Sequence, residues 1–115
     1  MKLPRQAVLL RIFVGESDKY QGRPMYEAIV EDARKRGLAG ATVVRCTAGF
    51  GASSRIHSSK LLRLSEDLPM LVEIVDEQEK IEAFLPDLDE MIDEGLVTME
   101  EVQVIVYRHS AKGQR

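Results

Sequence analysis

The order of strand-like and helix-like segments constrains the fold of this 115-residue chain more than any other feature. Alternating apolar residues are typical of strands, and apolar residues three or four apart are typical of helices. Strand-like runs occupy residues 6–14, 41–47, 70–75 and 101–107, and helix-like runs occupy 24–36 and 76–95. The order β-α-β-β-α-β predicts an α+β domain in which two helices cover one face of a four-stranded antiparallel sheet.

Residues at the ends of the two helical segments support this order. Pro24 suits the first position of a helix, and Gly37 suits the position just after its end. Asp76 is expected to cap the second helix and Gly95 to close it. Pro86 lies inside the second segment and is expected to kink or split that helix, because proline removes a backbone hydrogen bond.

Length and composition predict one domain over residues 1–115, with a core at about 6–107 and a flexible tail at 108–115. Apolar residues make up 44% of the chain and charged residues 30%, as in globular proteins. Cys46 is the single cysteine, which excludes an internal disulfide and disfavours a structural zinc site. We expect a cytoplasmic protein, because a single cysteine suits a reducing compartment and the apolar run at 8–14 is too short to span a membrane.

Apolar side chains occur on both faces of the first and last predicted strands. Leu9 and Phe13 oppose the stripe that contains Leu10, and Ile105 and Tyr107 oppose the valines of the last strand. A sheet face in water should carry mainly polar residues, and two helices can cover only one face. The pattern therefore predicts that the second face is buried against other copies of the protein.

Charge is distributed unevenly along the chain. Residues 33–65 contain seven Lys or Arg and no Asp or Glu, whereas residues 66–101 contain fourteen Asp or Glu and one Lys. Two interpretations stay open. The two segments bind each other, within or between subunits, or the basic segment faces an anionic ligand.

The long connection at residues 47–69 is the main candidate for a functional segment, because loops in compact domains usually have about four to six residues. Its glycines permit close backbone approach, its serines supply hydroxyl groups and its basic residues supply positive charge, which together suit phosphate or carboxylate. These residues are Gly49, Gly51, Ser53, Ser54, Arg55, Ser58, Ser59, Lys60 and Arg63. The alternative is a polar surface hairpin.

A second polar loop, at residues 15–23, separates the first strand from the first helix. Glu16 and Asp18 could accept hydrogen bonds from a ribose or an adenine amine, and Lys19 and Arg23 could pair with phosphate. A plain turn is the alternative interpretation.

Catalytic chemistry has weaker support in the sequence. Ser53 or Ser54 could be combined with His57 and Asp67 into a hydrolase triad, but the chain has no GxSxG motif. His57 is more typical of a polar loop residue than of a metal ligand. We therefore expect no enzymatic activity, no catalytic residues, no bound metal and no required cofactor.

Several strings of residues resemble a small family of uncharacterised PII-like (GlnB-like) signalling proteins, over about residues 9–105. They are Phe13-Val-Gly-Glu-Ser-Asp-Lys-Tyr, Pro24-Met-Tyr-Glu-Ala-Ile, Gly37-Leu-Ala-Gly-Ala-Thr-Val, Gly49-Phe-Gly-Ala-Ser-Ser-Arg-Ile-His, Leu64-Ser-Glu-Asp-Leu-Pro and Val72-Glu-Ile-Val-Asp. The resemblance implies a ferredoxin-like sandwich, a homotrimer with the sheets facing inward, and residues 47–69 in the place of the PII T-loop. It also implies an adenine-nucleotide site between subunits, and a membrane transport partner, because members are often associated with fluoride-exporting channels.

One departure from the better-known PII proteins bears on the ligand. Those proteins hold phosphates with a Gly-rich basic segment before the last strand. This chain has at that place the short segment 93–98, which is acidic because it begins with Asp93 and Glu94. The resemblance then implies AMP or ADP rather than ATP, with phosphates held by Arg45, the long loop or the 15–23 loop. The predicted nucleotide-binding residues are Glu16, Ser17, Asp18, Lys19, Arg23, Arg45, Gly49, Phe50, Gly51, Ser53, Ser54, Arg55 and His57.

The alternative function is a protein-interaction or RNA-binding module of the same strand order without a nucleotide, and a nucleotide hydrolase is a further, less favoured alternative. RNA-binding domains of this kind display stacking aromatic residues and a basic surface. The chain has six aromatic residues and a formal net charge of −3, which disfavours RNA.

Overall fold

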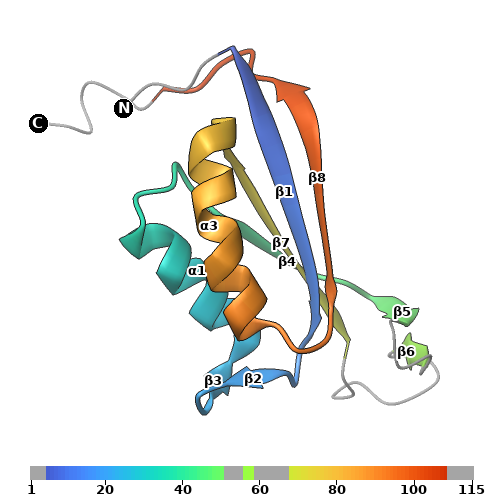
Figure 1. Cartoon of the computed structure of the whole chain (residues 1–115). Coiled ribbons are helices and arrows are strands. Elements are labelled where there is room, and N and C mark those ends of the chain that lie inside the picture. The colour runs from blue at the N-terminus through green and yellow to red at the C-terminus, as the bar shows by residue number, and fades with distance from the viewer. Residues whose placement is uncertain (1–4, 51–55, 59–67, 109–115) are drawn as a thin grey trace, which may run out of the picture.

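A computed structural model of the chain describes residues 5–50, 56–58 and 68–108. Its main sheet is antiparallel, with four strands in the order β4-β7-β1-β8. The strands are β1 (Gln6–Gly15), β4 (Thr42–Arg45), β7 (Pro69–Asp76) and β8 (Leu96–Gln103). Helices α1 (Met25–Lys35) and α3 (Gln78–Met91) lie on one face of this sheet (Figure 1). The predicted fold class is confirmed.

Two small hairpins occupy the segments that the sequence predicted as loops. The strands β2 (Lys19–Tyr20) and β3 (Arg23–Pro24) pair before α1, and β5 (Ala48–Phe50) pairs with β6 (Ile56–Ser58). Both hairpins lie at the end of the sheet where β1 ends and β7 begins (Figure 1). The fold therefore brings these two hairpins to the same end of the molecule.

The hydrophobic core lies between the sheet and the helices. Alternate residues of β1 and β7 point toward the helices, and Leu10, Ile12 and Val72 are fully buried. Ile29 of α1 and Phe84 of α3 pack against them, also fully buried. This arrangement follows from the period of two along a strand and of 3.6 along a helix.

The first helix begins and ends close to the predicted positions. Pro24 stands in the N-cap position with a φ of −55°, one residue before the helix, and Met25 is the first helical residue. Gly37 has a φ of +78°, a conformation that favours glycine. The amide of Gly37 donates to the carbonyl of Arg34 at 3.0 Å, and the amide of Leu38 donates to that of Ala33 at 3.1 Å. This Schellman arrangement confirms Gly37 as the C-terminal cap.

The ends of the second helix differ from the prediction. Asp76 belongs to β7 and is fully buried, and its carboxylate accepts from the amides of Ala39 at 2.8 Å and Glu77 at 2.7 Å. The N-cap position is therefore Glu77, because the Asp76 side chain is used to hold the loop after α1. The helix runs through Pro86 without being split, and it ends at Met91 rather than at Gly95.

The last strand lies about five residues earlier than the predicted range of 101–107. Leu96 pairs with Phe13 and Met99 with Leu10, so the acidic-looking segment 93–98 is partly strand. After Gln103 the chain leaves the sheet, and the amide of Val104 donates to the carbonyl of Arg5 at 2.5 Å. Of the alternating valines of the predicted strand, Val102 still pairs with Ala7 of β1, whereas Val104 and Val106 lie beyond the end of β8.

No helix within the described ranges is long and apolar enough to cross a lipid bilayer.

Candidate functional site

Glu16, which follows β1, contacts residues at the two ends, or roots, of the 47–69 segment: Arg45 before it and Leu68 near its end. The Arg45 guanidinium contacts the Glu16 carboxylate with Nε at 3.0 Å from Oε2 and Nη2 at 3.1 Å from Oε1. The amide of Glu16 donates to the carbonyl of Leu68 at 2.8 Å, and the amide of Cys46 donates to that of Pro69 at 2.9 Å. The ends of β1, β4 and β7 are thus joined at one place.

The hydrogen bond and the charge of Glu16 both raise the pKa of Arg45 above its usual value. A bidentate contact of this kind holds the planar guanidinium in a fixed orientation. Arg45 therefore presents its positive charge at a defined position beside the root of the long loop.

Asp18 shapes the 15–23 loop. Its Oδ2 accepts from the amide of Gly15 at 2.8 Å, and its backbone carbonyl accepts from the amide of Met25, the first helical residue, at 2.7 Å. The turn interpretation therefore explains Asp18 well. The loop it forms is held in place between β1 and α1.

The other predicted site residues of this loop are Ser17, Lys19 and Arg23, and they do not converge on one point. Arg23 directs its guanidinium toward Glu31 of α1, with a separation of 3.0 Å. Ser17 and Lys19 are exposed. From this loop, the structure brings the Glu16 carboxylate to Arg45.

The described part of the 47–69 segment is its hairpin. In that hairpin Gly49 pairs with His57 and Phe50 pairs with Ile56. A Cβ atom on Gly49 would stand 3.0 Å from Cγ of Pro69, so glycine allows β5 to approach β7 closely. The predicted site residues Gly51, Ser53, Ser54 and Arg55 lie outside the described residues, as do Lys60 and Arg63.

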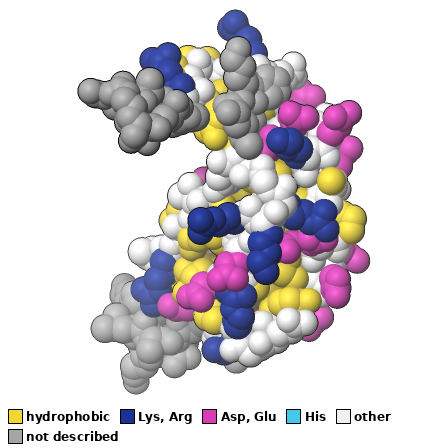
Figure 2. Space-filling view, turned by 90° about the vertical axis from the view of Figure 1, so that its left-hand side faces the viewer, with side chains coloured by type: hydrophobic (Ala, Val, Ile, Leu, Met, Phe, Trp, Pro, Cys, Tyr) yellow, Lys and Arg dark blue, Asp and Glu magenta, His cyan; other side chains and the backbone are white. Residues whose placement is uncertain are grey.

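Charged side chains of both signs lie among hydrophobic ones on the face of the molecule shown in Figure 2. Arg36, at the end of α1, makes two contacts with Asp87 of α3, at 2.6 and 2.7 Å. This pair joins the basic and acidic segments of the sequence within one chain. Residues 92–95, between α3 and β8, include the exposed Asp93 and Glu94, so this connection carries negative charge.

The face of the sheet opposite the helices is apolar around one charge cluster. Arg11 lies in its middle and contacts Glu73 and Glu100, each at 3.0 Å. Around it, Val44 is 44% exposed and Leu96 is 56% exposed. The apolar side chains that the sequence predicted on this face are present, and its burial against other copies of the protein stays a prediction.

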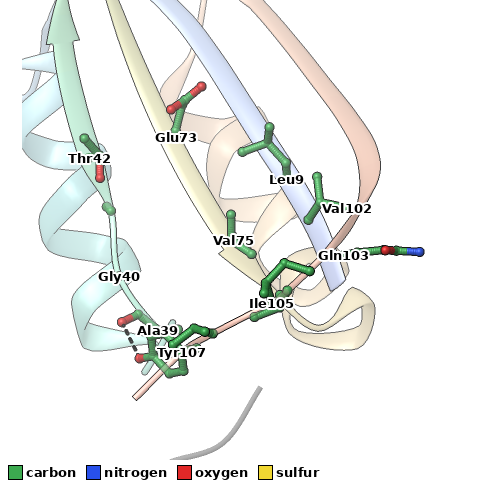
Figure 3. A pocket seen from close by; sticks show the side chains of 13 residues that line it. Leu9, Ala39, Gly40, Thr42, Glu73, Val75, Val102, Gln103, Ile105 and Tyr107 are labelled. Carbon is green, nitrogen blue, oxygen red and sulfur yellow. Dashed lines mark hydrogen bonds between the residues drawn. The ribbon is translucent and has the colours of Figure 1, made fainter. Parts of the chain in front are cut away.

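A cavity of about 780 Å³ lies on the open face, and it contains none of the predicted site residues. Leu9, Val75, Val102, Ile105 and Tyr107 surround it (Figure 3). The Tyr107 hydroxyl donates to the carbonyl of Ala39 at 3.2 Å, so the segment after β8 runs across the open face to the loop before β4, at the opposite edge of the sheet. Sequence reasoning missed this crossing, because the alternating valines indicated a continuing strand.

Within the described residues, no group of three or more His, Cys, Asp or Glu side chains could hold a metal ion.

The sequence of the chain matches a known protein family over most of its length. Residues 7–104 match the family model described as "DUF190: Uncharacterized ACR, COG1993". The chain belongs to the DUF190 family. It is 46% identical over 97 residues to a UPF0166 protein of Aquifex aeolicus, with 84% of this chain and 91% of the relative covered. It is 35% identical over 100 residues to a UPF0166 protein of Methanocaldococcus jannaschii, with 86% and 92% covered.

Solved structures place this DUF190 protein among PII-like folds. A putative PII-like signaling protein from Thermus thermophilus superposes with a TM-score of 0.62 at 18% identity, with 87% of this chain and 90% of the other covered. CPII, a nitrogen regulatory PII-like protein from Thiomonas intermedia, superposes with a TM-score of 0.59 at 19% identity, with 86% and 88% covered. That CPII structure is bound to ADP, AMP and bicarbonate. The PII-like ferredoxin-like fold implied by the sequence strings is confirmed.

Proposed function

We propose that this DUF190 protein is a PII-like regulator that binds an adenine nucleotide, with AMP or ADP preferred over ATP. In this proposal the nucleotide lies in clefts between the subunits of a homotrimer. Residues 47–69 signal the bound state to a partner, for which a membrane transport protein is the expected class. The observation that carries the proposal is the contact of Glu16 with Arg45 and Leu68, which joins both polar loops at one end of the sheet.

The chemistry at this end of the sheet suits a phosphate group. Arg45 offers a planar, permanently charged donor, and Lys19 adds an exposed positive charge in the neighbouring loop. CPII, which shares the fold, is bound to ADP and AMP, and this supports the same ligand class here.

The preference for fewer phosphates rests on the connection between α3 and β8. Asp93 and Glu94 are exposed there, and their charge repels the additional phosphates of ATP. A ligand with one or two phosphates needs less positive charge around it.

The trimer is supported by the open face of the sheet. Its exposed apolar residues, which include Val44 and Leu96, resemble an interface more than a surface in water. A second copy would cover them and would also supply the other wall of a cleft. An RNA ligand on this face is disfavoured, because Glu73 and Glu100 neutralise Arg11.

Isothermal titration calorimetry with AMP, ADP and ATP tests the proposal. We expect measurable binding of AMP and ADP, weaker binding of ATP, and a trimer by light scattering. The Arg45→Met variant should bind at least about tenfold more weakly, because a charged hydrogen bond contributes about 1.5–3 kcal/mol. The Arg36→Met variant changes an arginine of the helical layer and should bind like the wild type. Absence of heat with all three nucleotides would refute nucleotide binding.

A further inference from the structure

The contact between Glu16 and Arg45 has the geometry with which arginine holds a bound anion. Two nitrogens of one guanidinium meet two oxygens of one carboxylate, at 3.0 and 3.1 Å. A phosphate group presents paired oxygens to a guanidinium in the same way. A ligand phosphate that uses this edge of Arg45 must therefore displace Glu16.

We propose that Glu16 is an internal competitor, which occupies Arg45 until a phosphate-bearing ligand takes its place. The inference rests on the proposed function, and it adds the residue that sets the affinity of that site and responds to its occupation. Competition is feasible because the pair is open to solvent: the Glu16 side chain is 32% exposed and that of Arg45 is 49% exposed. Ion pairs with this exposure are weak, so a doubly charged phosphate can replace one carboxylate without unfolding the core.

Displacement of Glu16 changes contacts at both roots of the 47–69 segment. Arg45 is the last residue of β4, and the next amide, of Cys46, is bonded to Pro69. The backbone of Glu16 is bonded to Leu68, just before β7. Glu16 thus contacts the end of β4 through its side chain and the start of β7 through its backbone.

A ligand role for Glu16 predicts the opposite result. If the carboxylate accepts a hydrogen bond from ribose or adenine, its removal weakens binding, because a donor on the ligand loses its partner. If the carboxylate competes with phosphate, its removal strengthens binding. The sign of the change in affinity therefore separates the two roles.

The test is a calorimetric comparison of the full-length wild type with Glu16→Gln, using AMP and inorganic pyrophosphate as probes. Glutamine keeps the shape of the side chain and removes its charge. We expect Glu16→Gln to bind both probes about two- to fivefold more tightly, the range that corresponds to one exposed ion pair. The matched control is Asp87→Asn, which removes the carboxylate of the bidentate pair with Arg36 on the helical layer and should leave both affinities unchanged.

The same substitution in a protein that lacks Arg45 tests whether the effect of Glu16 on affinity acts through Arg45. In an Arg45→Met protein, the additional Glu16→Gln change should no longer tighten binding, as expected for two residues that act through one contact. A gain that persists without Arg45 would reflect the general charge of the protein and would overturn the inference.

The two proposals fail in different ways. If the wild type binds AMP and Glu16→Gln binds it equally or more weakly, the competition is refuted and nucleotide binding stands. If neither protein binds AMP but Glu16→Gln binds pyrophosphate more tightly than the wild type, the nucleotide proposal is refuted and the competition stands. If neither probe binds either protein, both proposals are refuted.

Discussion

On the helical side of the sheet, Leu10, Ile12 and Val72 are completely buried within one chain, whereas on the opposite side Val44 and Leu96 are 44% and 56% exposed. The same strands supply both faces, because successive side chains alternate across a strand. The helices remove the first set from water and leave the second set in it. Burial on the helical side therefore accounts for folding of the single chain, and the open side contributes stabilisation only when something covers it.

The largest effect should come from breaking the helical side. Phe84 of α3 is fully buried against the sheet, and Phe84→Ala should lower the free energy of unfolding by about 3–5 kcal/mol, because it loses apolar contact and leaves a cavity. Urea denaturation followed by circular dichroism measures this change. The neighbouring Leu85 is half-buried, so Leu85→Ala should cost clearly less. Equal costs would mean that the core does not centre on Phe84.

An intermediate effect, on assembly rather than folding, should come from the open side. Leu96→Lys places a charge on the open face at a residue that is 56% exposed in one chain. The single chain should change in stability by only about 0.5 kcal/mol or less. In the proposed trimer the same charge would be buried without a partner, so the assembly should dissociate.

Sedimentation velocity distinguishes these outcomes. Ala83→Lys makes the same change of charge at an exposed position in the middle of α3, and it should keep the oligomeric state of the wild type. If Leu96→Lys keeps that state as well, the open face is not the interface between copies.

Sequence reasoning succeeded where local pattern and tertiary contact agree. The alternation in β1 and the apolar stripes of the helices identified the sheet, its covered face and its apolar open face. The cap at Gly37 was predictable because a residue with positive φ is needed there and glycine adopts it most readily.

Sequence reasoning failed where a distant contact decides the local structure. Asp76 looked like a helix cap, but the amide of Ala39, 37 positions earlier in the chain, binds its carboxylate. The last strand starts at Leu96 because β1 offers a partner there, and no local signal marks that register. In the candidate site, Arg45 and Glu16 were predicted separately, and their mutual contact depends on how the ends of β1 and β4 meet.

The smallest effect should be a change in the pH dependence of stability, caused by two carboxyl groups between the helices, Asp32 of α1 and Asp87 of α3. A hydrogen bond with Asp87 and, to a lesser extent, burial raise the pKa of Asp32 above 3.8, whereas hydrogen bonds with Asp32 and Arg36 lower the pKa of Asp87 below 3.8. Among the described residues, Oδ2 of Asp32 is buried without a hydrogen-bond partner, which makes the charged form of this carboxyl group unfavourable. Asp32 therefore takes up a proton more readily than Asp87, whose charged form Arg36 stabilises.

The sign of the pH dependence follows from these directions. The pKa of Asp32 is higher in the folded protein than in the unfolded chain. Its contribution to the free energy of unfolding is therefore complete below pH 3.8 and declines as the pH rises through the raised pKa. The contribution of Asp87 has the opposite pH dependence: it is present above pH 3.8 and is lost as the pH falls through the lowered pKa.

The Asp32→Asn variant keeps a hydrogen-bond donor for Asp87 but has no carboxyl group to titrate. It should therefore gain stability relative to the wild type as the pH rises from about 4 to about 7. Urea denaturation over that range measures the difference, with the exposed Asp89→Asn as the control on α3. Stability curves of wild type and Asp32→Asn that stay parallel would show that folding does not raise the pKa of Asp32.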